Sequence, residues 1–330
     1  MMPSFLFIGI LLGLYSSPNE ALTCRLTPSN PYLVAHTITV DKSGKGKFSS
    51  VQSAIDSIPV ENAEWIRIQI PPGTYNEHIS IPPSKPCIFL DGAGRSSTII
   101  QWEDNQATTT FYSYADNLVV KGITVKNNYN VLSVRERKPA FAVDVNGDKN
   151  VFYSCGFVGV QDTLFDHMGR HYFVNCYIEG AVDFICGFGK SIYQRCTINY
   201  NGKYIPGLEG YITAQKKDSP NQSGGFVFKS CRFHGTGNAY LGRAWGPYST
   251  VIIANSKLWG GVVPLGWNAG HFSGHEATFM FAEAGNSGPG AVTSNRVRWS
   301  QKLNPVQLKR YTDISFINFD GWLAKIPKVF

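Results

Sequence analysis

A cysteine-centred pattern recurs at a regular interval along this chain, and it limits the possible folds more than any other feature. The run F-Y-S-C-G-F-V-G-V-Q-D contains Cys155 and ends at Asp162, and the run F-V-N-C-Y-I-E-G-A-V-D contains Cys176 and ends at Asp183. The two cysteines and the two aspartates are both 21 residues apart. A period near 20 residues is typical of a solenoid, in which each repeat forms one coil.

The composition of each repeat indicates what kind of coil it forms. Further copies of the pattern surround Cys196 and Cys231, and each copy has short runs of Val, Ile, Phe and Tyr broken by Gly, Asn and Asp. These are strand and turn residues, with little helical periodicity. The sequence therefore predicts an all-β chain folded as a single-stranded parallel β-helix. A β-sandwich with coincidental cysteine spacing is the rival, and the recurrence of the side-chain pattern along with the period argues against it.

A solenoid has open ends, and the sequence offers short helices to cover them. Apolar residues at helical spacing predict an amphipathic helix over residues 48–58, which Pro59 ends. A second short helix is expected to begin over residues 305–311. The long interval between Cys196 and Cys231 is rich in Gly, Ser and Pro, and we expect it to form loops on one face.

The two registered aspartates are candidates for chemistry. In a β-helix they would lie roughly 4.8 Å apart, one strand spacing, and carboxylates that close have pKa values pushed apart. Gln161 places an amide donor beside Asp162, as stabilisation of an oxyanion requires. Asp183 has apolar neighbours and needs a cation, for which Arg243 is the candidate; Trp245 offers a flat surface suited to sugar rings.

The remaining cysteines and histidines suggest no metal site. The chain has seven cysteines and no C-x-x-C motif. Disulfides are possible in an oxidising compartment, and Cys155 and Cys176 would be close enough to bridge, but we favour a ladder of buried thiols. His167 and His171 are four residues apart in a strand-and-turn region, where that spacing does not bring them together. We interpret both as surface or turn residues.

The N-terminus and the charge point to a secreted protein. An apolar run over residues 5–14, followed by small residues, predicts a signal peptide at 1–23 with cleavage near Ala21 or Thr23, and one domain over 24–330. No other segment is apolar enough to span a membrane. The formal net charge of +7 suits an anionic polysaccharide or lipid, and the absence of a long Lys/Arg run argues against nucleic acid. Asn221-Gln222-Ser223 is a glycosylation acceptor sequence.

Five short motifs are spread along the chain after the leader. They are residues 73–77 (G-T-Y-N-E), 161–164 (Q-D-T-L), 183–187 (D-F-I-C-G), 212–215 (I-T-A-Q) and 241–245 (L-G-R-A-W). In sequence and in order, these motifs resemble those of plant pectinesterases, the pectin methylesterases of the cell wall. The resemblance implies a right-handed parallel β-helix, no metal or organic cofactor, and methyl-esterified homogalacturonan as substrate. A monomer and an inhibitor protein as partner are expected, whereas the inhibitor-like pro-region of longer members is absent.

The resemblance also implies a role for each candidate residue. Asp183 would be the nucleophile on the methyl ester carbonyl. Asp162 would protonate the departing methanol and then activate water, and Gln161 would hold the oxyanion. Arg243 would fix and ionise Asp183, and Trp245 would line the substrate groove.

Four positions depart from the family pattern. Pro139 stands where the family commonly has a second oxyanion Gln, and proline has no side-chain donor. Ala244 replaces a Pro, Cys186 replaces a Phe beside the nucleophile, and Gly270 replaces an aromatic residue. These changes leave the pair Asp162 and Asp183 in place. They are expected to affect the catalytic rate and the binding of substrate.

Two other functions remain open on the sequence. A depolymerase, either a polygalacturonase or a pectate lyase, could use paired aspartates on the same fold, but the N-T-D, G-H-G and R-I-K motifs of polygalacturonases are missing. A non-catalytic wall protein that binds pectin through the groove is consistent with the departures at Pro139, Ala244 and Gly270.

Overall fold

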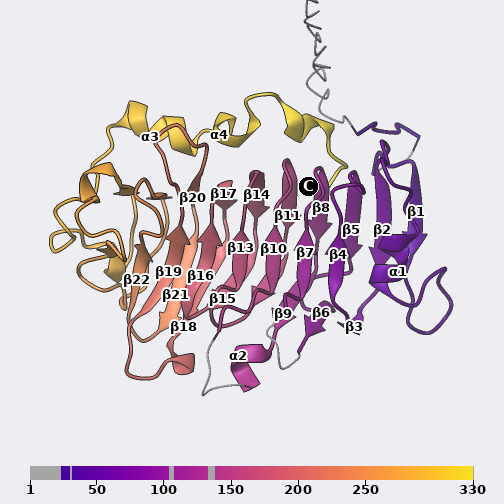
Figure 1. Cartoon of the computed structure of the whole chain (residues 1–330), viewed down its shortest axis with the longest axis horizontal. Coiled ribbons are helices and arrows are strands. Elements are labelled where there is room, and N and C mark those ends of the chain that lie inside the picture. The colour runs from indigo at the N-terminus through magenta and orange to yellow at the C-terminus, as the bar shows by residue number, and fades with distance from the viewer. Residues whose placement is uncertain (1–23, 30–31, 104–107, 133–137, 330) are drawn as a thin grey trace, which may run out of the picture.

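The chain folds as a parallel β-helix, as the repeat predicts. The computed structural model describes residues 24–29, 32–103, 108–132 and 138–329. In this part of the chain the strands form three sheets of ten, eight and seven strands, and each strand pairs in parallel with the equivalent strand of the next coil (Figure 1). Successive strands of one coil lie in different sheets, which rules out the β-sandwich.

The three sheets run the length of the molecule. The ten-stranded sheet contains β1 His36–Thr39, β2 Ile66–Ile70, β5 Ile88–Gly92, β8 Leu118–Lys121, β11 Asn150–Tyr153, β14 Arg170–Val174, β17 Lys190–Gln194, β20 Gly225–Lys229, β23 Thr250–Ala254 and β25 Met280–Ala284. The eight-stranded sheet contains β4 Ile79–Ile81, β7 Phe111–Ser113, β10 Val143–Val145, β13 Leu164–Asp166, β16 Val182–Gly187, β19 Gly210–Gln215, β22 Ala239–Arg243 and β24 Trp267–Asn268. The seven-stranded sheet contains β3 Gly73–Asn76, β6 Thr98–Trp102, β9 Thr124–Asn127, β12 Gly156–Val158, β15 Tyr177–Gly180, β18 Thr197–Asn201 and β21 Arg232–Thr236.

The cysteine ladder marks one corner of each coil. The residue before each cysteine of the repeat has a positive φ, as at Ser154 (53°) and Asn175 (55°), which turns the chain from the ten-stranded into the seven-stranded sheet. The cysteine that follows is fully buried, and its thiol donates to a backbone carbonyl, as from Cys155 to Val120 at 3.4 Å. The five cysteines of residues 155–231 are free thiols, so the ladder is confirmed and the bridge between Cys155 and Cys176 is not formed.

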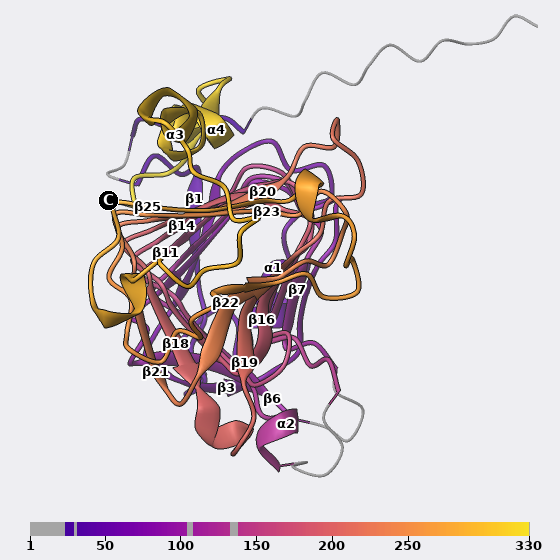
Figure 2. The same cartoon turned by 90° about the vertical axis from the view of Figure 1, so that its left-hand side faces the viewer.

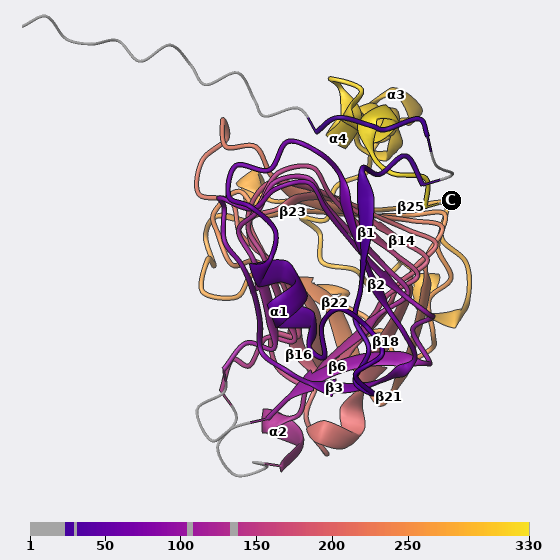
Figure 3. The same cartoon turned by 90° about the vertical axis from the view of Figure 1, so that its right-hand side faces the viewer.

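The N-terminal end is closed by α1, Val51–Asp56, which is shorter than the predicted 48–58 (Figure 3). Ser50 is its N-cap and accepts a hydrogen bond from the Ser53 amide. The Glu77 carboxylate also accepts from the Val51 and Gln52 amides, at 3.0 and 2.9 Å. Glu77 ends the G-T-Y-N-E motif, which therefore holds the end cap against the first coils.

The predicted C-terminal helix exists, but it does not cap the solenoid's end. The C-terminal helices are α3 Pro305–Thr312, α4 Ser315–Asn318 and the 3₁₀ helix η4 Trp322–Lys325. They run along the outside of the ten-stranded sheet (Figures 1 and 2). This sheet is apolar on both faces: Val119, Val151 and Ile192 form a second core with Ile317 and Trp322. The uncovered apolar face, rather than the open end, is what these helices bury.

The other helices are short and peripheral. They are α2 Tyr129–Leu132, η1 Gly202–Tyr204, η2 Glu276–Thr278 and η3 Pro289–Ala291. The interval between Cys196 and Cys231 forms one coil, with β18 and β19, and two loops at 202–209 and 216–224. None of the helices in the described part of the chain is long and apolar enough to cross a membrane.

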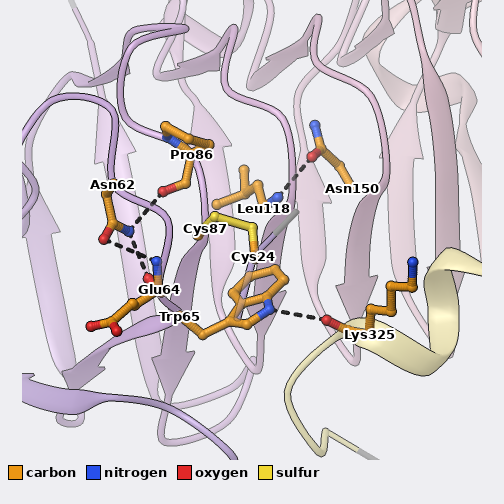
Figure 4. Close-up of a disulfide and its surroundings, with 9 residues drawn as sticks. All are labelled: Cys24, Asn62, Glu64, Trp65, Pro86, Cys87, Leu118, Asn150 and Lys325. Carbon is orange, nitrogen blue, oxygen red and sulfur yellow. Dashed lines mark hydrogen bonds between the residues drawn. A yellow bond between two sulfur atoms is a disulfide. The ribbon is translucent and has the colours of Figure 1, made fainter. Parts of the chain in front are cut away.

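A disulfide that the sequence did not assign fixes the start of the described chain. Cys24 and Cys87 are bonded, with Cα atoms 5.7 Å apart (Figure 4). Both belong to the second core under the C-terminal segment. Beside them the Trp65 indole N–H donates to the Lys325 carbonyl at 3.0 Å, so the first described residues and the C-terminal segment pack on the same face. The predicted signal peptide at 1–23 lies outside the described residues.

Candidate active site

The structure places Asp162 and Asp183 at equivalent positions of neighbouring coils. Gln161 forms a parallel β-bridge with Val182, and Leu164 pairs with Ile185 in the sheet. Both partners are 21 residues apart, so the backbone pairs with the same register before and after the aspartates. Both aspartates have a positive φ, 58° and 48°, which is uncommon for a residue with a side chain. The backbone at the two aspartates therefore has a similar φ. The residues lie one coil apart, at the N-terminal ends of β13 and β16 in the eight-stranded sheet.

Arg243 reaches Asp183 from the end of β22, two strands further along the sheet. Its Nε donates to Asp183 Oδ1 at 2.8 Å, and its Nη2 donates to Oδ2, which makes a bidentate pair. The guanidinium also lies over the Tyr211 ring, 4.6 Å from its centroid, and Tyr211 stacks on Tyr240 at 5.2 Å. The pairing register of β16 with β19 shifts between Val182 and Ile185. Asp183 therefore lies within a β-bulge or similar irregularity, a feature that can redirect a side chain.

The two carboxyl groups differ in their electrostatic surroundings. Burial raises the pKa of Asp183, and the bonded Arg243 opposes that rise. Burial and the neighbouring Asp183 charge raise the pKa of Asp162 to about 7. The positive charge of Arg243 lowers this pKa by electrostatic attraction, without a hydrogen bond to Asp162, and only partly offsets the rise. At neutral pH this asymmetry favours an ionised Asp183 beside an Asp162 that can hold a proton.

Gln161 and Pro139 occupy neighbouring coils next to this pair. Gln161 is partly exposed, and its backbone carbonyl accepts a hydrogen bond from the Ala140 backbone amide at 3.3 Å. Pro139 is exposed and directly precedes Ala140. A side-chain amide on one coil is therefore available near the aspartates, whereas the preceding coil presents a proline.

Trp245 belongs to a row of rings that sequence reasoning otherwise missed. Its ring centroid lies 6.3 Å from those of Phe165 and Phe188, and Phe165 stacks on Phe141 at 4.9 Å and on His167 at 4.2 Å. We call these five residues the aromatic wall. Strand alternation could have found Phe165, because buried Leu164 precedes it and fixes the inward face.

His171 is not a surface or turn residue, contrary to the sequence interpretation. It is fully buried; its Nδ1 lies 2.5 Å from Asp166 Oδ1, and its Nε2 lies 2.7 Å from the Gly147 carbonyl. Burial alone would lower the pKa of His171, but the charge of Asp166 and the hydrogen bonds to Asp166 and the Gly147 carbonyl act together to raise that pKa. Tyr193 completes the group by donating to Asp166 Oδ2 at 2.6 Å. His167, by contrast, is partly exposed and lies 3.2 Å from Asp144.

No group of three or more potential metal ligands occurs among the residues that the structure describes. The side chains described above bring together two carboxyl groups of unequal acidity, a guanidinium, an amide and an aromatic surface. This set suits acyl transfer through a carboxylate nucleophile.

Comparison with known proteins decides the family. A family model described as Pectinesterase matches residues 37–320. The chain belongs to the pectinesterase family.

Relatives of this pectinesterase match it over nearly its whole length. Probable pectinesterase 55 of Arabidopsis thaliana is 46% identical over 96% of this chain and 98% of its own. Probable pectinesterase 29 of the same plant is 45% identical over 98% of both chains. Among solved structures, pectin methylesterase from carrot is 30% identical, with a TM-score of 0.81 over 87% of this chain and 94% of its own. The resemblance seen in the motifs and the right-handed parallel β-helix are both confirmed.

Two departures from the pectinesterase motifs pack against each other beside Arg243. The Ala244 amide, which a proline would lack, donates to the Asn268 carbonyl at 3.0 Å. Gly270 has a φ of 59°, and a Cβ there would lie 2.4 Å from the Ala244 carbonyl oxygen. A glycine at 270 therefore avoids a collision with the Ala244 carbonyl, and an alanine at 244 keeps an N–H for the hydrogen bond to Asn268. The strand that carries Arg243 pairs in register with β24.

Proposed function

We propose that this pectinesterase hydrolyses the methyl esters of galacturonosyl residues in cell-wall pectin, giving methanol and de-esterified pectin. The observation that carries the proposal is the pair of registered carboxyl groups, one bonded to Arg243 and the other with a pKa raised to about 7 by burial and its neighbour's charge. Family and fold support pectin as the substrate.

In the first half-reaction the Asp183 carboxylate attacks the ester carbonyl and forms a tetrahedral oxyanion. The Gln161 amide donates to that oxyanion. When the intermediate collapses, the bond to the methoxy oxygen breaks, and protonated Asp162 delivers its proton to that oxygen. Methanol leaves, and Asp183 is joined to the galacturonosyl carbonyl as an anhydride.

In the second half-reaction Asp162, now ionised, takes a proton from water as that water attacks the galacturonosyl carbonyl. The anhydride breaks and returns Asp183 as a carboxylate bonded to Arg243, with Asp162 protonated again. The new galacturonic acid group loses its proton to solvent. Throughout, the bidentate contact keeps Asp183 ionised and aimed, while Trp245 and its neighbours supply a surface for the sugar rings.

The same proposal places the protein outside the cell, as a secreted monomer of the cell wall whose leader ends near residue 23. Asn221 is exposed in the 216–224 loop, where an oligosaccharide could be attached. The groove that takes pectin is also where an inhibitor protein would bind. We propose no metal or organic cofactor.

The test is methanol release from highly methylated pectin by the purified, folded protein, with reducing ends measured in parallel. We expect methanol to accumulate while the number of reducing ends stays constant. Reducing ends that rise without methanol would identify a depolymerase. A folded protein that binds pectin but releases neither would identify a non-catalytic wall protein.

A further inference from the structure

The buried imidazole of His171 is a titratable group that the chemistry described above does not use. Its Nδ1 lies 2.5 Å from Asp166 Oδ1, and its Nε2 lies 2.7 Å from the Gly147 carbonyl oxygen, which can only accept a hydrogen bond. The Tyr193 hydroxyl donates to the other oxygen of the Asp166 carboxyl at 2.6 Å, which favours its ionised form. Both ring nitrogens therefore face acceptors, and a neutral imidazole has only one N–H to offer them. The two contacts are satisfied together only when both nitrogens carry a proton.

The charges around His171 favour such a cation. The titratable groups on its own strand and on the elements packed against its ring are Asp148, Asp166, Arg170, Cys186, Tyr193 and Cys196. Burial opposes a charge on His171, but the negative charges of Asp166 and Asp148 and the hydrogen bonds of the ring raise its pKa. Arg170 is bonded to Asp148 at 2.6 Å. Burial raises the pKa values of the thiols and of the Tyr193 hydroxyl, so these groups stay neutral.

The backbone around Asp166 supports the aromatic wall. Asp166 follows Phe165 in β13, and its carbonyl accepts a hydrogen bond from the Gly189 amide at 2.9 Å. The next carbonyl, that of His167, accepts from the Phe188 amide at 2.9 Å. Gly189 also packs so closely on the Asp166 carboxylate that a Cβ at position 189 would lie 1.9 Å from Oδ1. Three of the five wall residues thus flank Asp166 in the chain or belong to the turn that packs on it.

We propose that His171 is held as an imidazolium in the core and acts, through Asp166, as a positioning residue for the aromatic wall. The inference rests on the proposed function, in which that wall carries the sugar rings of the substrate. While His171 keeps both protons, Asp166 is fixed from the core side, and the strand end and turn above it stay in place. When the ring loses one proton to solvent, one of its nitrogens faces an acceptor oxygen with no hydrogen between them. That contact is repulsive, so Asp166 or the Gly147 carbonyl has to move.

The consequence is a pH dependence of substrate binding that is separate from catalysis. Loss of the proton loosens the wall and weakens binding, whereas kcat changes less, because Asp162 precedes β13 and Asp166 ends it. Folding raises the pKa of His171 above 6.5, so its stabilising effect is fully present below pH 6.5. The effect is lost as the pH rises through the pKa of the folded state, and the unfolding equilibrium constant grows by up to about tenfold per pH unit in that window.

The direct test of the charged state is an NMR titration of the imidazole nitrogens from about pH 6 to about pH 9. His171 is the only fully buried histidine of the seven, all of which the structure describes, so slow exchange of its N–H protons with water identifies it. We expect both of its nitrogens to be protonated at pH 7. In Asp166→Asn the titration should move below pH 6.5, because the contacting charge is gone and burial opposes the cation. A wild-type His171 that is neutral at pH 7 would overturn the proposal.

The positioning role is tested by equilibrium binding of a fully de-esterified oligogalacturonate, which carries no ester and cannot turn over. Its Kd for the wild type should rise by about 2- to 30-fold from about pH 6 to about pH 9, the range expected for coupling through packed residues. His171→Gln keeps one N–H donor and cannot titrate, so its Kd should stay level over that range. The matched control is His234→Gln in β21, where the side chain is exposed, and it should repeat the rise of the wild type.

An equal rise of Kd in the wild type and in folded His171→Gln would overturn the positioning role, since the titrating group would then lie elsewhere. If that variant does not fold, the wild-type NMR titration and Asp166→Asn still decide the charged state. Methanol assays separate this inference from the proposed function. Normal methanol release with the same Kd profile in both proteins sinks the positioning role alone. A Kd profile that His171→Gln abolishes, in a protein that releases no methanol from methylated pectin, sinks the esterase alone.

Discussion

Two carboxyl sites flank the same short strand, β13, and they are built in opposite ways. Asp162 precedes the strand and is partly exposed, and its charged neighbours are Asp183 and Arg243. Asp166 ends the strand and is fully buried, with His171 on one carboxylate oxygen and Tyr193 on the other. Only three residues lie between Asp162 and Asp166, yet the Asp166 carboxylate accepts hydrogen bonds on both of its oxygens and the Asp162 carboxyl is partly exposed.

On this difference we base the proposal that Asp162 is reactive and Asp166 structural. A buried carboxylate that accepts hydrogen bonds from fixed donors is stabilised in one state and has no room for a reacting group. Within the described part of the chain, no hydrogen bond to the Asp162 carboxyl is found; burial and the like charge of Asp183 are the effects that raise its pKa. Unsatisfied, half-buried groups of this kind cluster at functional sites.

The sharpest way to test the comparison is to replace each carboxylate by its amide. Asp183→Asn should lower kcat by at least about 10³-fold, because an amide oxygen is a poor nucleophile at neutral pH. Its melting temperature should stay close to that of the wild type. The measurement is methanol release, with circular dichroism to verify folding. Near-normal turnover by the folded variant would show that Asp183 is not the nucleophile.

The buried site should show the reverse pattern. Asp166→Ala removes the partner of both His171 and Tyr193 and should cost about 3–5 kcal/mol of unfolding free energy. Urea denaturation measures this, with exposed Asp218→Ala as a control expected to change stability by less than about 0.5 kcal/mol. If both variants unfold at the same urea concentration as the wild type, Asp166 contributes no more to stability than a surface aspartate.

The pH profile should report on Asp162. A general acid works in its protonated form, so kcat/KM should fall about tenfold per pH unit above a pKa of about 7. Stability should move in the same direction. The pKa of Asp162 is raised in the folded state from 3.8 to about 7, so folding favours the proton. Stability from this group is then present below about pH 4 and is lost as the pH rises to about 7.

Asp162→Asn provides the control for that assignment. The variant cannot ionise at this position, so above pH 7 it should be more stable than the wild type by about 1–2 kcal/mol, discounted for partial exposure. The two proteins should converge in stability near pH 4. An Asn variant that is equally less stable at both pH values would contradict a raised pKa at Asp162.

The smallest effect is expected at Pro139. Pro139→Gln supplies a side-chain donor in the coil next to Gln161 and should raise kcat a few-fold, with about 10² as an upper limit. Because such a donor acts mainly in the transition state, KM should change less than kcat. Both constants are to be measured on one pectin. A kcat that stays the same or drops would mean that Pro139 is only a turn residue and that Gln161 and the backbone already suffice.

The sequence predicted the solenoid, its capping helix near residue 50, the thiol ladder and the registration of Asp162 with Asp183. The solenoid, the ladder and the registration follow from the period, because residues one repeat apart become neighbours on adjacent strands. The capping helix follows instead from apolar residues at helical spacing. It also proposed Arg243 for Asp183, but only because a buried carboxylate needs a cation and the family motif offered one. The pairing spans 60 residues, and no local pattern marks it.

Tertiary structure alone decided the features that cross the repeat. The C-terminal helices lie on a sheet face rather than over an end, Cys24 bonds Cys87, and Trp65 donates to a carbonyl 260 residues away. Contacts along the coil axis repeat and leave a period in the sequence. Contacts between a coil and a segment packed outside it occur only once and leave no period in the sequence. Such a segment packs where the coils leave apolar surface exposed, and that surface exists only in the folded chain.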